Sequence, residues 1–99
     1  MSSDHALFKF SVTCQTNDPA VLHCLRALCQ FAEQHKKRQI GWGGTGKSEW
    51  QAKSGRFTLH FTHPKYRQRF IEEANRILGG LWSLIGTSDN DPAVPQRHL

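Results

Sequence analysis

The most specific chemical pattern in the chain is a glycine-rich segment that ends in a lysine and a serine. Residues 41–48 read GWGGTGKS, which matches the spacing of the phosphate-binding loop of nucleotide hydrolases. That loop needs a strand before it and a helix directly after it, whose N-terminus faces the phosphates. Here a basic helix end precedes the motif and a short, turn-bounded segment follows it, so we expect no nucleotide hydrolysis. A weaker role stays open, in which glycine N–H groups beside Lys47 bind a phosphate of nucleic acid.

Positive charge is concentrated in the middle of the chain. The formal net charge is +5, and residues 36–69 hold nine of the 13 Lys and Arg residues against Glu49 as their one acid. Such a segment attracts a polyanion or an acidic protein surface. Tryptophans lie among these cations, and cations with stacking aromatics are what single-stranded nucleic acid requires. The candidate nucleic-acid or anion-binding residues are Lys36, Lys37, Arg38, Trp42, Lys47, Trp50, Lys53, Arg56 and His60.

Metal-binding and catalytic patterns are incomplete. His60 and His63 have the spacing H-x-x-H, but a metal site needs three or four converging ligands. We therefore expect no metal and no cofactor, and a binding module rather than an enzyme.

The three cysteines do not suggest a disulfide framework. Their number is odd, and Cys24 and Cys29 are five residues apart on an expected helix, which turns them to different faces. All three fall on apolar faces, which favours inert thiols. A reducing cytoplasm is the expected location.

Strand and helix patterns alternate along the chain. Residues 6–15 alternate polar and apolar side chains, as a half-buried strand does. Asp18 and Pro19 are suited to begin a helix, and Val21, Leu25 and Leu28 continue at helical spacing. The apolar stripe of this helix is widened by Leu22, Cys24, Cys29 and Phe31.

The second half predicts a hairpin, another helix and a final element. Residues 39–47 form either a distorted edge strand or a long loop. Residues 49–53 and 56–62 are expected to pair as strands around Ser54–Gly55. A helix then begins at His63–Pro64 and ends near Gly79–Gly80. Residues 81–85 are either a short last strand, which we favour, or a last helical turn.

This order predicts an α+β fold, a ferredoxin-like two-layer sandwich (βαββαβ) with an antiparallel sheet and two helices on one face. We expect one domain over residues 6–86, with flexible ends at 1–5 and 87–99.

Three functional hypotheses follow from these features. The first is a small basic binding module that contacts nucleic-acid phosphates through residues 36–56. The second is a protein-interaction or inhibitor module that acts on an acidic partner, as a homodimer. The third is a small enzyme or ligand binder with its site at the sheet–helix or dimer cleft. None of the three involves a membrane.

Overall fold

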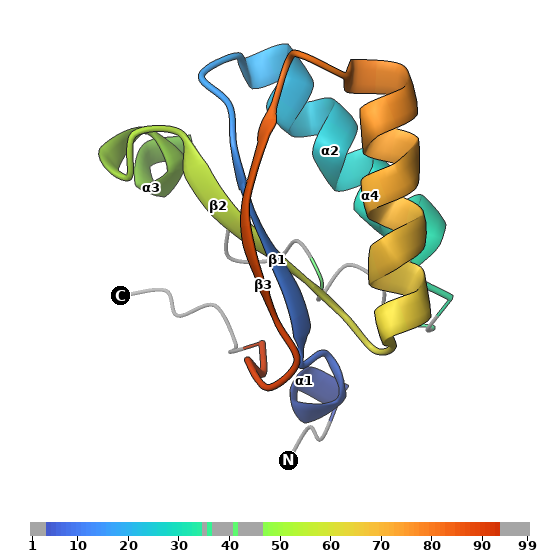
Figure 1. Ribbon diagram of the computed structural model, residues 1–99. Helices are drawn as coiled ribbons and strands as arrows, with labels where there is room; N and C mark the ends of the chain where they lie inside the picture. Colours follow the sequence, from blue (N-terminus) through green and yellow to red (C-terminus); the bar gives the residue numbers. More distant parts are fainter. Residues whose placement is uncertain (1–3, 35, 37–40, 42–46, 94–99) are drawn as a thin grey trace.

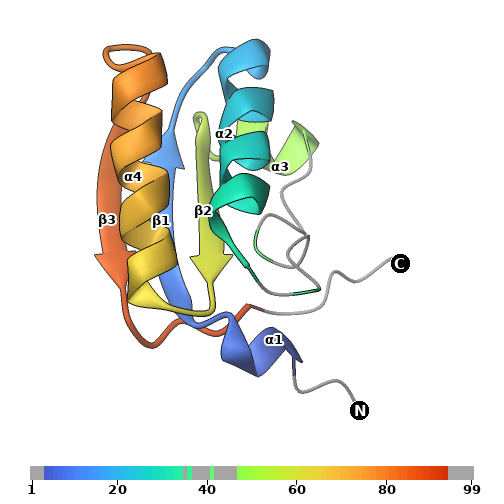
Figure 2. The same ribbon diagram turned by 90° about the vertical axis from the view of Figure 1, so that its right-hand side faces the viewer.

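A computed structural model describes residues 4–34, 36, 41 and 47–93 of the 99-residue chain. The elements follow in the order α1 (Asp4–Leu7), β1 (Phe10–Gln15), α2 (Pro19–Ala32), α3 (Lys47–Ala52), β2 (Arg56–Phe61), α4 (Pro64–Leu78) and β3 (Ser83–Ser88). The three strands form an antiparallel sheet in the order β2-β1-β3. Helices α2 and α4 lie side by side on one face of that sheet (Figures 1 and 2). The α+β class is therefore confirmed, with three strands among the described residues.

The two long helices begin as their sequences predict. The Asp18 side chain accepts a hydrogen bond from the Ala20 N–H at 2.9 Å, and Pro19 occupies the first turn of α2. At α4 the His63 Nδ1 accepts from the Lys65 N–H at 3.0 Å, and Pro64 follows it. In both cases a side chain satisfies a backbone donor that the first helical turn leaves without a partner.

The core lies between the sheet and these two helices. Val12 and Cys14 of β1 stand opposite Leu59 and Phe57 of β2, and all four are buried. Phe70 of α4 packs on the same cluster, with its ring centroid 5.5 Å from that of Phe61. Alternation along β2 therefore places its phenylalanines in the core and leaves Arg56, Thr58 and His60 on the face away from the helices.

The expected strand over residues 49–53 is wrong, because this segment belongs to helix α3. The Gly55 N–H donates to the Trp50 carbonyl at 2.9 Å, five residues back, and Ser54 has a φ of 60°. This pattern is typical of a helix C-terminus with a left-handed residue. Ser54–Gly55 is thus a turn, as predicted, but it joins a helix to a strand. Gly55 itself has a φ of 85°, and a Cβ there would lie 2.5 Å from the Thr16 carbonyl oxygen.

Described structure lies beyond both bounds of the predicted domain, 6–86. Residues 4–7, placed partly in a flexible terminus and partly in the first strand, form helix α1. The last strand is confirmed, but it runs to Ser88, and the chain beyond it packs back onto the fold. The Asp91 N–H donates to the Lys9 carbonyl at 2.8 Å, and the N–H of the buried Ala93 donates to the Phe8 carbonyl at 2.9 Å. Backbone hydrogen bonds therefore hold residues 91 and 93 against the segment that leads into β1.

Across the part of the chain that the structure describes, every helix is too short or too polar to cross a bilayer.

Candidate functional site

Two of the predicted basic residues stand together at the start of β2. Lys53 and Arg56 are both exposed, and the Arg56 N–H donates to the Lys53 carbonyl at 3.2 Å across the turn. Neither side chain forms an ion pair with any described carboxylate. Their charges are therefore available to a ligand in solution.

Polar side chains continue from this pair across the sheet face that α2 and α4 leave uncovered. The polar sheet face consists of Thr13, Gln15, Arg56 and Thr58. The two threonine hydroxyls lie 3.2 Å apart, and the Gln15 amide nitrogen donates to the Ser54 carbonyl at 3.1 Å. Hydroxyls and amides of this kind are common partners of phosphate oxygens.

Lys36 lies at the opposite end of β2 from Lys53 and Arg56. It follows the end of α2, where Glu33 contacts Thr62 just beyond the last residue of β2. A six-residue strand is about 20 Å long, so Lys36 is separate from Lys53 and Arg56. Lys37, Arg38 and Trp42 lie outside the described residues, as does the side chain of Lys47.

Trp50 is not available to stack on a base, which corrects the expectation from the sequence. The side chain is 3% exposed, and its indole N–H donates to the carbonyls of Thr16 at 2.8 Å and Gly55 at 3.1 Å. It is a core residue whose hydrogen bonds connect α3 to the sheet.

His60 is half-buried under the C-terminal segment. Its Nε2 lies 3.5 Å from Oδ2 of Asp91, and only 15% of its side chain is exposed. Burial lowers the pKa of the imidazole, against the opposing effects of the Asp91 carboxylate and the Gly41 carbonyl. A role as a freely accessible cation is therefore poorly supported.

The glycine-rich motif has a packing role at its first residue. A Cβ at Gly41 would overlap the His60 carbonyl oxygen and lie 3.0 Å from the Cys29 sulfur, so only glycine fits there. Helix α3 does begin at the motif's Lys47, contrary to the expected strand, but it has six residues and the preceding element, α2, is a helix. The described elements on either side of the motif are therefore two helices, whereas the phosphate-binding loop of nucleotide hydrolases follows a strand.

Candidate metal ligands and nucleophiles are not assembled in the described part of the chain. No group of three or more His, Cys, Asp or Glu side chains converges there. All three cysteines are free. Burial raises the pKa of Cys14 and of Cys29, which keeps both thiols protonated and unreactive. Cys24 is exposed, so its expected place on the apolar face is wrong.

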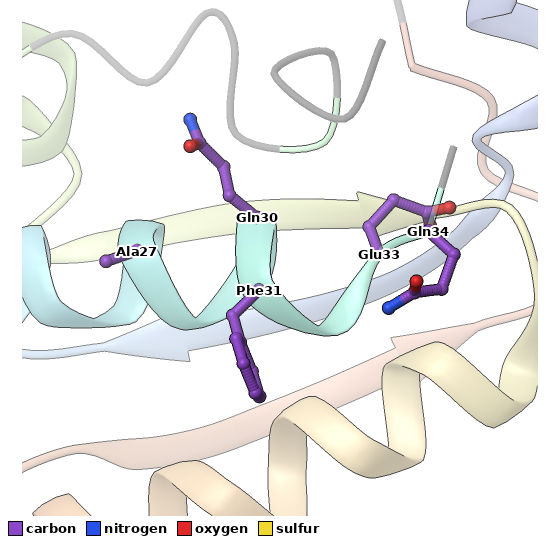
Figure 3. A pocket seen from close by; sticks show the side chains of 5 residues that line it. All are labelled: Ala27, Gln30, Phe31, Glu33 and Gln34. Atoms are coloured by element: carbon purple, nitrogen blue, oxygen red, sulfur yellow. The ribbon is translucent and has the colours of Figure 1, made fainter. Parts of the chain in front are cut away.

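A surface hollow that the sequence did not indicate runs beside the C-terminal half of α2. Its volume is about 390 Å³, and it is lined by Ala27, Gln30, Phe31, Glu33 and Gln34. In Figure 3 the Phe31 ring extends toward α4, Gln34 lies at the helix end, and Gln30 extends to the other side. Phe31 is 63% exposed, which corrects its expected place in the apolar stripe.

Comparison with protein-family models, with curated proteins and with solved structures found no match to this chain.

Proposed function

We propose that this protein is a small binding module that contacts nucleic-acid phosphates through Lys53, Arg56 and the polar sheet face. The observation that supports this proposal is that Lys53 and Arg56 are exposed, adjacent and without carboxylate partners among the described residues. Because these cations have no ion pair to break, binding phosphate does not cost them an existing interaction. The net charge of +5 favours a polyanion further.

The sheet face suggests contacts to the nucleic-acid backbone rather than to its bases. Thr13, Gln15 and Thr58 carry small polar groups, and no aromatic side chain of β1 or β2 stands between them. Such a face fits phosphate and sugar oxygens and reads no base sequence. Lys36, Lys37, Arg38 and Lys47 are proposed as further phosphate contacts, and Trp42 as a stacking residue.

The fold is compatible with this proposal. We infer that the order β2-β1-β3, with two helices on one face, corresponds to a ferredoxin-like sandwich in which α3 takes the place of the second strand. The inference concerns architecture alone and does not identify a ligand.

The test is a salt titration of oligonucleotide binding. Fluorescence anisotropy of labelled single-stranded DNA and RNA should show binding at about 50 mM salt that weakens steeply by about 200 mM. The double variant Lys53→Gln/Arg56→Gln should lower the slope of log K against log salt by about 0.7 for each phosphate that the protein no longer neutralises. The control, Lys9→Gln/Arg76→Gln, removes the same charge from other exposed positions. Equal binding by the two double variants, or no binding at low salt, would contradict the proposal.

One observation favours the second function, a protein-interaction module that acts as a homodimer. Strand β3 is an edge of the sheet, all six of its residues are exposed, and it contains no charged residue and no proline. Leu84 and Ile85 are 47% and 44% exposed on it. Natural edge strands usually carry charges or prolines that prevent pairing with another chain.

A further inference from the structure

Phe31 is exposed on a helix whose other large apolar residues are buried or half-buried. The residue is 63% exposed, whereas Leu25 and Cys29 of the same helix are fully buried. The ring borders the hollow of about 390 Å³, which Gln34 also lines, whereas Gln30 extends to the other side of the helix (Figure 3). A volume of this size lies in the range of small-molecule sites, about 300–1,000 Å³.

A cation from the neighbouring helix stands over this ring. The guanidinium carbon of Arg69, on α4, lies 5.8 Å from the Phe31 ring centroid. This is a cation–π distance, and it places the positive charge beside the ring that lines the hollow. Arg69 forms no ion pair with a described carboxylate, so it can also bind an anion.

The remaining lining groups complement a polar, planar ligand. The Gln34 amide makes no hydrogen bond within the described residues, and it offers both donors and an acceptor. The Glu33 carboxylate is 1% exposed and accepts two hydrogen bonds from Thr62, so it is directed into the protein.

We propose that the hollow beside Phe31 binds an adenine base that carries a phosphate. The base stacks on the Phe31 ring, the Gln34 amide pairs with its N6 and N7 atoms, and the phosphate binds the Arg69 guanidinium. An aliphatic ligand would leave the Gln34 amide and the Arg69 guanidinium without partners. A bare phosphate would leave the exposed ring unused.

This site is separate from the phosphate contacts proposed at Lys53 and Arg56. It lies at the C-terminal end of α2, which Glu33 and Thr62 place beside the end of β2, whereas Lys53 and Arg56 stand at the beginning of β2. The two proposals can therefore fail independently. The Lys53→Gln/Arg56→Gln variant should bind a mononucleotide in the hollow as well as the unchanged protein does.

The experiment is an NMR titration of the full chain with AMP, adenosine, UMP and inorganic phosphate. We expect AMP to shift the Phe31 ring and Gln34 amide resonances saturably, and to bind more tightly than UMP, which offers a smaller ring. Phe31→Ala should weaken AMP binding about tenfold. Arg69→Gln should weaken the binding of AMP while leaving that of adenosine unchanged, because it removes only the phosphate contact.

Two controls keep the result interpretable. Ile77→Ala truncates a similarly exposed apolar residue, 51% exposed and about 12 Å further along α4 than Arg69, and should leave AMP binding unchanged. Phe31→Ala should keep the circular dichroism spectrum, since its side chain is mostly in solvent. Absence of saturable shifts with AMP and adenosine, or unaltered AMP binding by Phe31→Ala, would overturn the proposal.

The source of the base is decided by a competing oligonucleotide. A short oligoadenylate that displaces AMP at lower concentration would support the site and assign it to single-stranded nucleic acid. Displacement only at higher concentration would support the site and assign it to a free nucleotide.

Discussion

Glu33 and Thr62 connect the end of α2 to the end of β2 through two hydrogen bonds. The Thr62 backbone N–H donates to Oε1 of Glu33 at 2.8 Å, and its hydroxyl donates to Oε2 at 2.6 Å. Glu33 is 1% exposed, so its charge depends on partners inside the protein. The pair fixes the end of α2 over the sheet, immediately before the cation-rich residues that begin at Lys36.

Removing this carboxylate should destabilise the fold substantially. We expect Glu33→Ala to lower the free energy of unfolding by about 2–4 kcal/mol, because it leaves the Thr62 donors without partners. Thr62→Ser keeps both donors and should cost much less. Urea unfolding of the two variants measures the difference, and equal losses would show that the hydrogen bonds contribute little.

Trp50 and Trp82 offer a matched pair of substitutions in the core. The Trp50 indole N–H has two carbonyl acceptors, whereas the Trp82 indole N–H is buried without a partner among the described residues. Trp50→Phe should therefore cost about 1–2 kcal/mol more stability than Trp82→Phe. Both changes remove similar volume, so the difference measures the hydrogen bonds. A larger loss for Trp82→Phe would contradict this account.

The parts of the fold that local chemistry determines could be predicted from the sequence. Asp18–Pro19 and His63–Pro64 begin helices because a side-chain acceptor and a residue without an N–H suit the first turn in any context. The prediction for residues 49–53 is wrong because a Ser-Gly pair ends helices as readily as it joins strands. Their composition, EWQAK, does contain good helix formers, which is the signal that favoured α3.

The candidate sites could be predicted less well, because they depend on which elements meet in space. Lys36 and Lys53 both belong to the cation-rich residues 36–56, but they lie at opposite ends of β2. Their separation along the sequence does not reveal this. Phe31 is different, since its position was available from helical geometry. At about 100° per residue it lies about 120° from Leu25, outside the buried stripe. The approach of Arg69 required the packing of α2 against α4, which no local pattern encodes.

His60 should make stability depend on pH below neutrality. Burial lowers its pKa from the ordinary 6.5, so the unfolded chain binds the proton more readily than the folded chain. The contribution of the neutral His60 ring to the free energy of unfolding is fully present above about pH 6.5. It is lost as the pH falls from there toward the lower pKa of the folded state. The Asp91 carboxylate, 3.5 Å from Nε2, opposes this loss in part, because it favours the protonated ring.

The pH effect is tested by urea unfolding between about pH 8 and pH 5, the window in which histidine titrates. His60→Gln should flatten the dependence across this range, since glutamine does not titrate. His23→Gln, an exposed position on α2, should leave it unchanged. If His60→Gln loses stability on acidification as steeply as the unchanged protein, another group is responsible.

The exposed β3 edge predicts self-association if the homodimer proposal holds. Two copies of one strand pair antiparallel about a twofold axis, so each satisfies the free backbone groups of the other. Light scattering should then show a dimer that dissociates on dilution. Ile85→Lys places a charge on each copy of the uncharged edge and should give a monomer, whereas Ile77→Lys on α4 should not. A dimer that survives Ile85→Lys would place its interface elsewhere, and a monomer at high concentration would leave the uncharged β3 edge to a different partner chain.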